Sequence, residues 1–104
     1  MKRFELGRIV ATPGAIAAVT QEFLLKCLVR HAKCDWGDLS TEDKVENDLA
    51  VKVGGLRIFS SYKFPGGKLW VITEADRSVT TVLMPKGSVT KSPPPIGVAT
   101  ERLA

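Results

Sequence analysis

The stretch "LRIFSSYKFPGGKLWVITEADRSVTTVLM" (residues 56–84) decides the fold, because it alternates three β-rich segments with two turns. The β-rich segments are residues 56–63, 68–73 and 79–84. Each is rich in β-branched and aromatic residues, which favour strands. Pro65-Gly66-Gly67 and residues 74–78 supply the residue types of turns. Strands joined by connections this short pair antiparallel, so the stretch predicts a three-stranded meander.

Helical signals fill the chain upstream of the meander, after a first predicted strand at residues 4–11. Thr12-Pro13 reads as an N-cap followed by proline at the first helical position. Apolar residues at positions 23, 24, 27 and 28 then recur at helical spacing. These patterns predict helical structure over residues 13–33. They leave open whether it is one kinked helix or two.

The segment "CDWGDLSTEDKVENDLA" (residues 34–50) holds six of the chain's eleven carboxylates and therefore raises the question of a site. Ser40 followed by Asp43 has the order of a capping box. Glu42 and Asp43 also suit the positive end of a helix dipole. We therefore predict a helix that ends at Gly54-Gly55. Its narrow apolar stripe consists of Val45, Leu49 and Val53.

The predicted elements follow the order β-α-α-β-β-β. That order predicts an α+β fold, a small antiparallel sheet with helices packed on one face, in a single domain over residues 1–85. Residues 86–104 contain Ser92-Pro93-Pro94-Pro95 and little apolar periodicity. They predict a flexible, disordered C-terminal tail.

Composition excludes several classes of protein. Hydrophobic residues make up 44% of the chain and charged residues 25%, as in soluble globular domains. The apolar runs are too short to span a bilayer, and no signal-peptide segment follows the basic start, so we expect a cytoplasmic protein without membrane contact. The net charge of +4 comes from basic residues spaced almost singly, which suits only weak, salt-sensitive contact with nucleic acid.

One set of side chains has spacing that a metal could use. Cys27, His31 and Cys34 would lie near one face of a helix. Cys27 falls within the apolar stripe, and no fourth soft ligand is near, so we predict a core cysteine and a helix-end histidine rather than a metal site. A calcium loop starting at Asp35 fails because Gly37 stands where that loop needs Asp or Asn. We expect no cofactor.

A second reading comes from the order of the elements. A β-α-α-β-β-β order with basic and aromatic residues on the meander resembles RelE-like ribosome-dependent RNase toxins. Such enzymes use cations to stabilise a phosphoryl transition state. The residues concerned are Arg57, Tyr62, Lys63 and Arg77. The alternative function is therefore a toxin-type enzyme that acts on nucleic acid.

Four segments carry a closer resemblance over roughly residues 4 to 85. They are "GRIVATPGA" (7–15), "RHAKCDWGDL" (30–39), "END" (46–48) and "LWVITEADRSVTTVLMP" (69–85). Together they resemble a group of short bacterial proteins encoded on plasmids and other mobile elements. Members carry labels such as "plasmid-related protein" or "type I restriction endonuclease subunit M". The resemblance implies a mobile-element context and no established activity.

The second label implies a DNA methyltransferase, which the residues do not support. An adenine methyltransferase needs a glycine-rich turn after a strand and an Asn-Pro-Pro-aromatic motif. Here Gly54-Gly55 precedes a strand, and the prolines in succession lie at residues 93–95. A doubly wound fold also does not fit in 104 residues. We therefore expect no methyltransferase.

The leading hypothesis is an accessory protein of a mobile element that acts by binding a protein partner rather than as an enzyme. Turn residues can project from one sheet edge, and a tryptophan at a turn supplies a large anchor. The candidate contact surface is Trp36, Asp38, Glu74, Asp76 and Arg77. The competing interpretation packs the tryptophan on the core and uses the polar residues to satisfy turn amides. Interference with host restriction or CRISPR defence suits the context, and the oligomeric state stays open.

Overall fold

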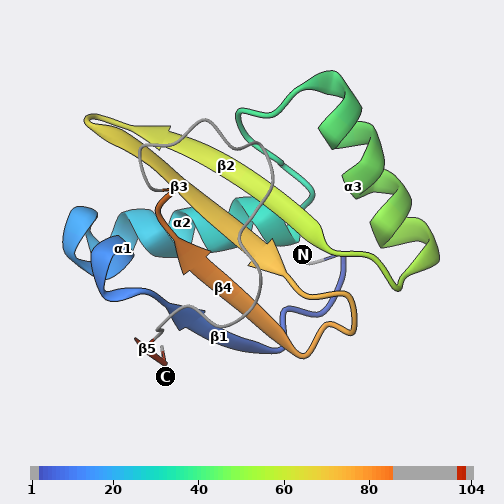
Figure 1. Cartoon of the computed structure of the whole chain (residues 1–104), viewed down its shortest axis with the longest axis horizontal. Helices are drawn as coiled ribbons and strands as arrows, with labels where there is room; N and C mark the ends of the chain where they lie inside the picture. The colour runs from blue at the N-terminus through green and yellow to red at the C-terminus, as the bar shows by residue number, and fades with distance from the viewer. Residues whose placement is uncertain (1–2, 86–100, 103–104) are drawn as a thin grey trace.

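A computed structural model describes residues 3–85 and 101–102 of the chain. It contains a five-stranded sheet in the order β2-β3-β4-β1-β5, with three helices beside it (Figure 1). The N-terminal elements are β1 (Arg8–Ala11), α1 (Pro13–Ala18), α2 (Gln21–Ala32) and α3 (Thr41–Val53). The remaining strands are β2 (Ile58–Phe64), β3 (Gly67–Thr73), β4 (Val79–Leu83) and β5 (Glu101–Arg102).

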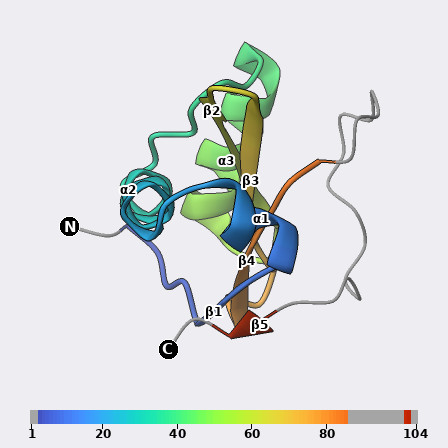
Figure 2. The ribbon, with the colours of Figure 1, turned by 90° about the vertical axis from the view of Figure 1, so that its left-hand side faces the viewer.

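The predicted meander and helix layer are confirmed. β2 pairs antiparallel with β3, and β3 pairs antiparallel with β4. Figure 2 views the sheet nearly edge-on and shows α2 along one of its faces. α3 packs through Ala50 against Ile58, whose side chain alternates onto the same face as Tyr62. The chain is thus a small α+β fold, as its sequence predicts.

The sheet is mixed, not antiparallel throughout as predicted. β1 pairs parallel with β4, from Arg8 opposite Val79 to Ala11 opposite Val82. The Thr12 amide extends this pairing by donating to the Val82 carbonyl oxygen at 2.9 Å. Parallel pairing requires a long connection between the two strands, and the helices and β2–β3 provide it. The sequence pattern predicts each strand separately and does not carry this long-range partnership.

The predicted tail lies mostly outside the described residues. Residues 86–100 and 103–104 are not described, so the prediction of a flexible segment is untested there. Glu101–Arg102 differ from that prediction, because they form β5 and pair antiparallel with β1. The outer edge of β1 carries backbone donors and acceptors that a further strand can satisfy.

Two local signals set the N-terminal boundaries. β1 begins at Arg8 and not near residue 4, because Gly7 has a φ of 65°, which interrupts extended backbone. The helical stretch is two helices. Thr12 caps α1 by accepting from the Ala15 amide, and Thr20 caps α2 by accepting from the Phe23 amide.

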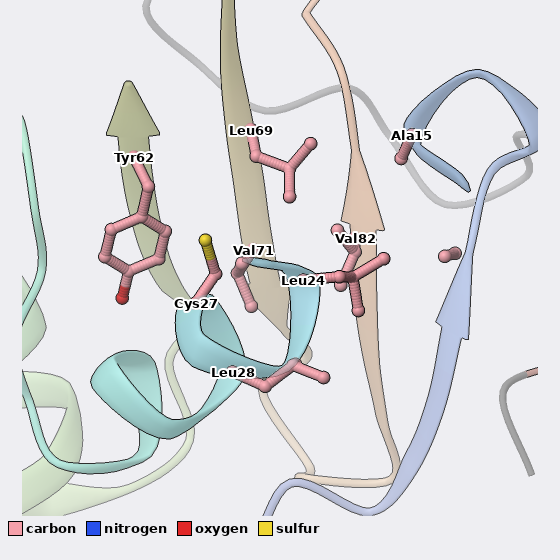
Figure 3. Close-up of a cluster of buried hydrophobic side chains, with 9 residues drawn as sticks. Ala15, Leu24, Cys27, Leu28, Tyr62, Leu69, Val71 and Val82 are labelled. Carbon is pink, nitrogen blue, oxygen red and sulfur yellow. The ribbon is translucent and has the colours of Figure 1, made fainter. Parts of the chain in front are cut away.

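The main core lies between α2 and the sheet. Figure 3 shows Cys27 on α2 among apolar side chains from β2, β3 and β4. The buried members are Ala11, Ala15, Leu24, Cys27, Leu28, Tyr62, Leu69, Val71 and Val82. Strand residues whose side chains point to the opposite face of the sheet form a separate buried cluster. It consists of Trp70, Ile72 and Leu83, with Phe59 packed beside them. The sheet therefore buries apolar side chains on both faces.

The apolar stripe of α3 points away from the core. Val45, Leu49 and Val53 are 60%, 50% and 62% exposed. The buried residues of α3 are instead Asn47 and Ala50. Apolar spacing of this kind usually marks the face that packs inward. Here polar contacts, described below, fasten the opposite face of α3 to β2.

The start of α3 gives the first testable prediction. Ser40 is its N-cap, and the side-chain oxygen accepts from the Asp43 amide at 3.1 Å, as predicted. Ser40→Ala should lower the free energy of unfolding by about 0.5–2 kcal/mol in chemical denaturation. Thr41→Ala removes a hydroxyl one residue later and should change it by less than about 0.5 kcal/mol. Equal losses in the two variants would contradict the capping assignment.

Candidate functional site

The loop that contains Trp36 pairs with the edge of the sheet. Gly37 forms a parallel bridge with Ser61 of β2. The Ser61 amide donates to the Trp36 carbonyl oxygen at 3.1 Å, and the Asp38 amide donates to the Ser61 carbonyl oxygen at 2.6 Å. Gly37 has a φ of 74°, and a Cβ there would overlap the Ser61 carbonyl and the Tyr62 ring. Only glycine allows the loop to approach β2 this closely.

Asn47 of α3 also covers the edge of β2. Its side-chain nitrogen donates to the Phe59 carbonyl oxygen at 2.6 Å, and its side-chain oxygen accepts from the Phe59 amide at 3.1 Å. The amide side chain thus takes the place of a neighbouring strand at that residue. This pairing explains why a polar residue is buried on α3.

Trp36 belongs to the core. The side chain is 4% exposed, and the indole Nε1 donates to an Asp48 carboxylate oxygen at 2.9 Å. The ring lies 6.2 Å from Phe4 and 5.8 Å from His31 between centroids. Of the two interpretations of this residue, packing on the core is the one that the geometry supports.

Arg77 joins the second turn to α3. It adopts a φ of 61°, and its guanidinium donates to the Ala50 and Leu56 carbonyl oxygens at 2.9 and 2.7 Å. The same group bonds the backbone of its own turn at Glu74 and Ala75. A guanidinium that satisfies several carbonyls holds the turn against the end of the helix.

The other polar candidates also have partners within the described residues. Glu74 pairs with Arg57 through two hydrogen bonds, at 3.0 and 3.2 Å. Asp76 is exposed and accepts from the Ser78 amide, and hydrogen bonds to Ser78 hold the pKa of Asp76 below its ordinary value. Asp38 is exposed and forms an ion pair with Lys63 at 3.3 Å.

The structure brings only part of the predicted set together. Phe4 links the two turns, because it lies beside Trp36 and beneath the Arg77 guanidinium, which is 5.9 Å from the ring centroid. Trp36 and Arg77 also form hydrogen bonds to α3, Trp36 to the Asp48 carboxylate and Arg77 to the Ala50 carbonyl oxygen. Asp38 lies elsewhere, beside Lys63 of β2. The shared task of Trp36 and Arg77 is therefore to fasten α3 to the sheet.

Sequence reasoning missed a buried polar chain around His31. The imidazole is fully buried and bonds the Ser60 hydroxyl through Nδ1 and the Thr73 hydroxyl through Nε2 at 2.9 Å. The Thr73 hydroxyl forms a hydrogen bond with the Thr80 hydroxyl at 2.7 Å. The Thr80 hydroxyl in turn donates to the Leu6 carbonyl oxygen. A hydroxyl beside an imidazole can act in catalysis when a substrate reaches it. This pair has no access to solvent, so its role is to join α2 to three strands.

A signal for that network was present in the sequence. Ser60, Thr73 and Thr80 are hydroxyl residues at strand positions that face α2, where apolar residues are expected. His31 lies on the apolar face of α2, one turn from Cys27 and Leu28. Polar residues at inward positions of both layers indicate a buried hydrogen-bond network.

The histidine and cysteines do not form a metal centre. Within residues 3–85 and 101–102, no group of three or more His, Cys, Asp or Glu could hold an ion. Burial lowers the pKa of His31 to about 3, with the Arg77 cation as a smaller cause. Burial also raises the pKa of Cys27 to about 11, so the thiol stays protonated and acts as a small apolar group. Cys34 is half-buried at the end of α2 and has a φ of 68°.

The cationic and aromatic residues of the toxin interpretation are dispersed. Tyr62 is buried, and its hydroxyl donates to the Asp35 carbonyl oxygen at 2.7 Å. Burial raises the pKa of that hydroxyl. Arg57 pairs with Glu74, and Lys63 with Asp38. Arg77 bonds backbone carbonyls, so these groups do not converge on one exposed point.

Among residues 3–85, the large exposed apolar residues lie mainly on two helices. On α2, Leu25 and Val29 are 51% and 52% exposed, and with Glu22, Lys26 and Arg30 they line a hollow along that helix. On α3 and just after it, the exposed residues are Val45, Leu49, Val53 and Leu56. Contiguous exposed apolar side chains rimmed by charges are typical of protein–protein contact surfaces. These two helix faces are the candidate functional surfaces.

No family model, curated protein or solved structure matches the chain. In the part of the chain that the structure describes, none of the helices has the length and apolar character to cross a bilayer.

Proposed function

We propose that this protein is a non-catalytic binding module that recognises a protein partner through the outer flank of α2. The observation that carries the proposal is the exposure of Leu25 and Val29, which lie one turn apart with half of each side chain in solvent. Binding would remove this apolar surface from water, the main source of affinity at interface centres.

The charges around this pair define the chemistry of the partner. Lys26 and Arg30 border the hollow, and Lys33 follows one turn later, whereas Glu22 is the acid beside them. Arg30 already pairs with Asp35 at 2.7 Å, which holds the guanidinium near the hollow. An amphipathic, acidic segment of a protein would fit an apolar pair with a basic border. The basic border also fits the mildly positive net charge of the chain.

The turn residues predicted from the sequence have a secondary place in this proposal. Asp38 and Asp76 are exposed and can meet a partner at the rim. Trp36 and Arg77 are used inside the fold, so neither acts as an anchor. The resemblance to mobile-element proteins supports a cytoplasmic accessory role, and a component of host defence is the partner class that we propose.

Affinity purification with matched baits tests the proposal. The wild-type chain should retain a specific host protein, and the Leu25→Glu/Val29→Glu double variant should lose it, because two carboxylates would be desolvated at the interface centre. Leu49→Glu makes a comparable change on α3 and should retain the partner. Circular dichroism confirms that each bait is folded. A partner held equally by the α2 variant and the wild type would contradict this surface.

A further inference from the structure

The hydrogen bonds around His31 run in one direction, which the Leu6 carbonyl sets. A carbonyl oxygen only accepts, so the Thr80 hydroxyl donates its single hydrogen to Leu6 at 2.7 Å. Thr80 must then accept from the Thr73 hydroxyl, because it has no second hydrogen to give. Thr73 has now given its own hydrogen, so it accepts from Nε2 of the imidazole at 2.9 Å. The ring of His31 therefore carries its hydrogen on Nε2.

The other ring nitrogen, Nδ1, is the basic atom of this imidazole. A neutral imidazole has one N–H, so Nδ1 accepts and the Ser60 hydroxyl donates to it. Among the described residues, the partners of both ring nitrogens are hydroxyls, and neither nitrogen bonds a carboxylate. A proton taken up at Nδ1 would turn this acceptor into a donor and force the Ser60 hydroxyl to reverse. The closed network therefore suits the neutral ring and resists the charged one.

The N-terminal segment, residues 3–6, closes over this network. The Arg3 amide donates to the last carbonyl oxygen of α2 at 2.8 Å. The Phe4 ring packs edge to face with His31, with 5.3 Å between the centroids. The same segment supplies the carbonyl that ends the donor chain. It lies outside the helices and strands, so opening it breaks fewer bonds than unfolding the whole domain does.

The charges around the ring oppose a proton there while the segment is closed. Burial, and to a smaller extent the Arg77 cation in the turn before β4, lower the pKa of His31 to about 3. Asp48 of α3 is exposed and bonded to Trp36, whose ring packs on the imidazole. The remaining titratable neighbours are exposed charges of the N-terminal segment and of α2, and two thiols and a phenol whose pKa values burial raises: Arg3, Glu5, Arg30, Cys27, Cys34 and Tyr62.

We propose that the N-terminal segment is an acid-operated latch, which uptake of one proton at Nδ1 of His31 releases from α2 and the sheet. With residues 3–6 open, the imidazole reaches water and takes up a proton near its ordinary pKa of 6.5. Below that pH, the population of the open form rises by about tenfold for each pH unit. Release uncovers the rings of His31 and Trp36, against which Phe4 packs in the closed form.

Nitrogen-15 NMR of the imidazole in the full chain tests the closed arrangement. At pH 7, Nε2 should give the signal of a protonated ring nitrogen and Nδ1 that of an unprotonated one. Thr80→Val cuts the link to the Leu6 carbonyl and leaves Thr73 free to donate to the ring, so this variant should also populate the Nδ1–H form. A wild-type ring with its hydrogen on Nδ1 would overturn the proposal.

Hydrogen exchange of the Arg3 amide measures the opening of the latch. Between pH 6.5 and 4.5 its protection factor, corrected for the intrinsic exchange rate, should fall by roughly fiftyfold in the wild type. In His31→Gln, which lacks the titrating group, it should stay constant. At each pH the Val71 amide of the interior strand β3 should be better protected, because it exchanges only when the domain unfolds.

Two results of the exchange experiment on the wild type would each overturn the latch, whether or not His31→Gln folds. Protection of Arg3 that does not depend on pH would show that its release involves no proton. Equal protection of Arg3 and Val71 would show that the segment opens only together with the whole domain.

Discussion

Trp36→Ala is expected to lower the free energy of unfolding by about 3–5 kcal/mol, a large share of the roughly 5–15 kcal/mol that a domain of this size possesses. The indole is buried and packs with Phe4, His31 and Ile58. Truncation would leave a cavity and remove the hydrogen bond to Asp48. Urea denaturation monitored by circular dichroism measures the loss.

Trp36→Phe separates packing from hydrogen bonding. It keeps an aromatic ring but removes the Nε1 donor, so it should cost about 1–2 kcal/mol. The remaining Asp48 carboxylate is exposed and can be solvated by water, which limits the penalty. A loss below about 1 kcal/mol for Trp36→Ala would show that the indole is not part of the core.

Acid should destabilise the fold through His31, beginning near pH 6.5, before most carboxylates titrate. The folded state holds the pKa of this imidazole near 3, whereas an unfolded chain takes up the proton near the ordinary value of 6.5. The stabilisation is therefore fully present above pH 6.5 and is lost progressively as pH falls toward 3. Between pH 6.5 and 4.5 the free energy of unfolding should fall by about 2–3 kcal/mol.

Denaturation at pH 7 and pH 4.5, at constant ionic strength, measures this fall. His31→Gln lacks the titrating group and should show little change over the same window, although it is less stable at neutral pH. The window lies above the ordinary pKa of 3.8 for Asp35 and Asp76, whose lowered pKa values act at still lower pH.

NMR of the wild-type protein tests the same prediction without depending on whether His31→Gln folds. His31 is the sole histidine of the chain, so its imidazole NMR signal is unambiguous. That signal should stay constant in the folded protein from pH 7 to 4.5. Titration with a midpoint near 6.5 would contradict the buried network with Ser60 and Thr73.

The helices and the strands of this fold, with the exception of β5, follow from local patterns in the sequence. Thr12, Thr20 and Ser40 are all helix caps, and hydroxyl groups in these positions bond amides within three residues. The strands of the meander follow from β-rich runs between turn residues. Such signals act over a few residues, so a single sequence is enough to reveal them.

Contacts between distant segments were not predictable in the same way. The stripe of α3 has core spacing, yet Asn47 on the opposite side is buried because its amide matches the free edge of β2 at Phe59. That match depends on where α3 meets the strand, which no local pattern encodes. The same limit explains why the turn residues predicted as a contact surface are not all available: Trp36 and Arg77 make contacts inside the fold instead. From the sequence, Arg77 is a charged residue in a turn and is expected to face solvent. In the structure its guanidinium donates a hydrogen bond to the Ala50 carbonyl oxygen near the end of α3.

The parallel pairing of β1 with β4 has a consequence for the order of folding. Arg8 at the start of the chain meets Val79 near the end of the meander, so their contact closes a loop of most of the described chain. Closing a loop of that length is entropically costly unless the intervening segments have already condensed. During synthesis, the first strand therefore has to wait until β4 has left the ribosome. Local hairpins β2–β3 and β3–β4 should form first, with β1 added to β4 afterwards and β5 added to β1.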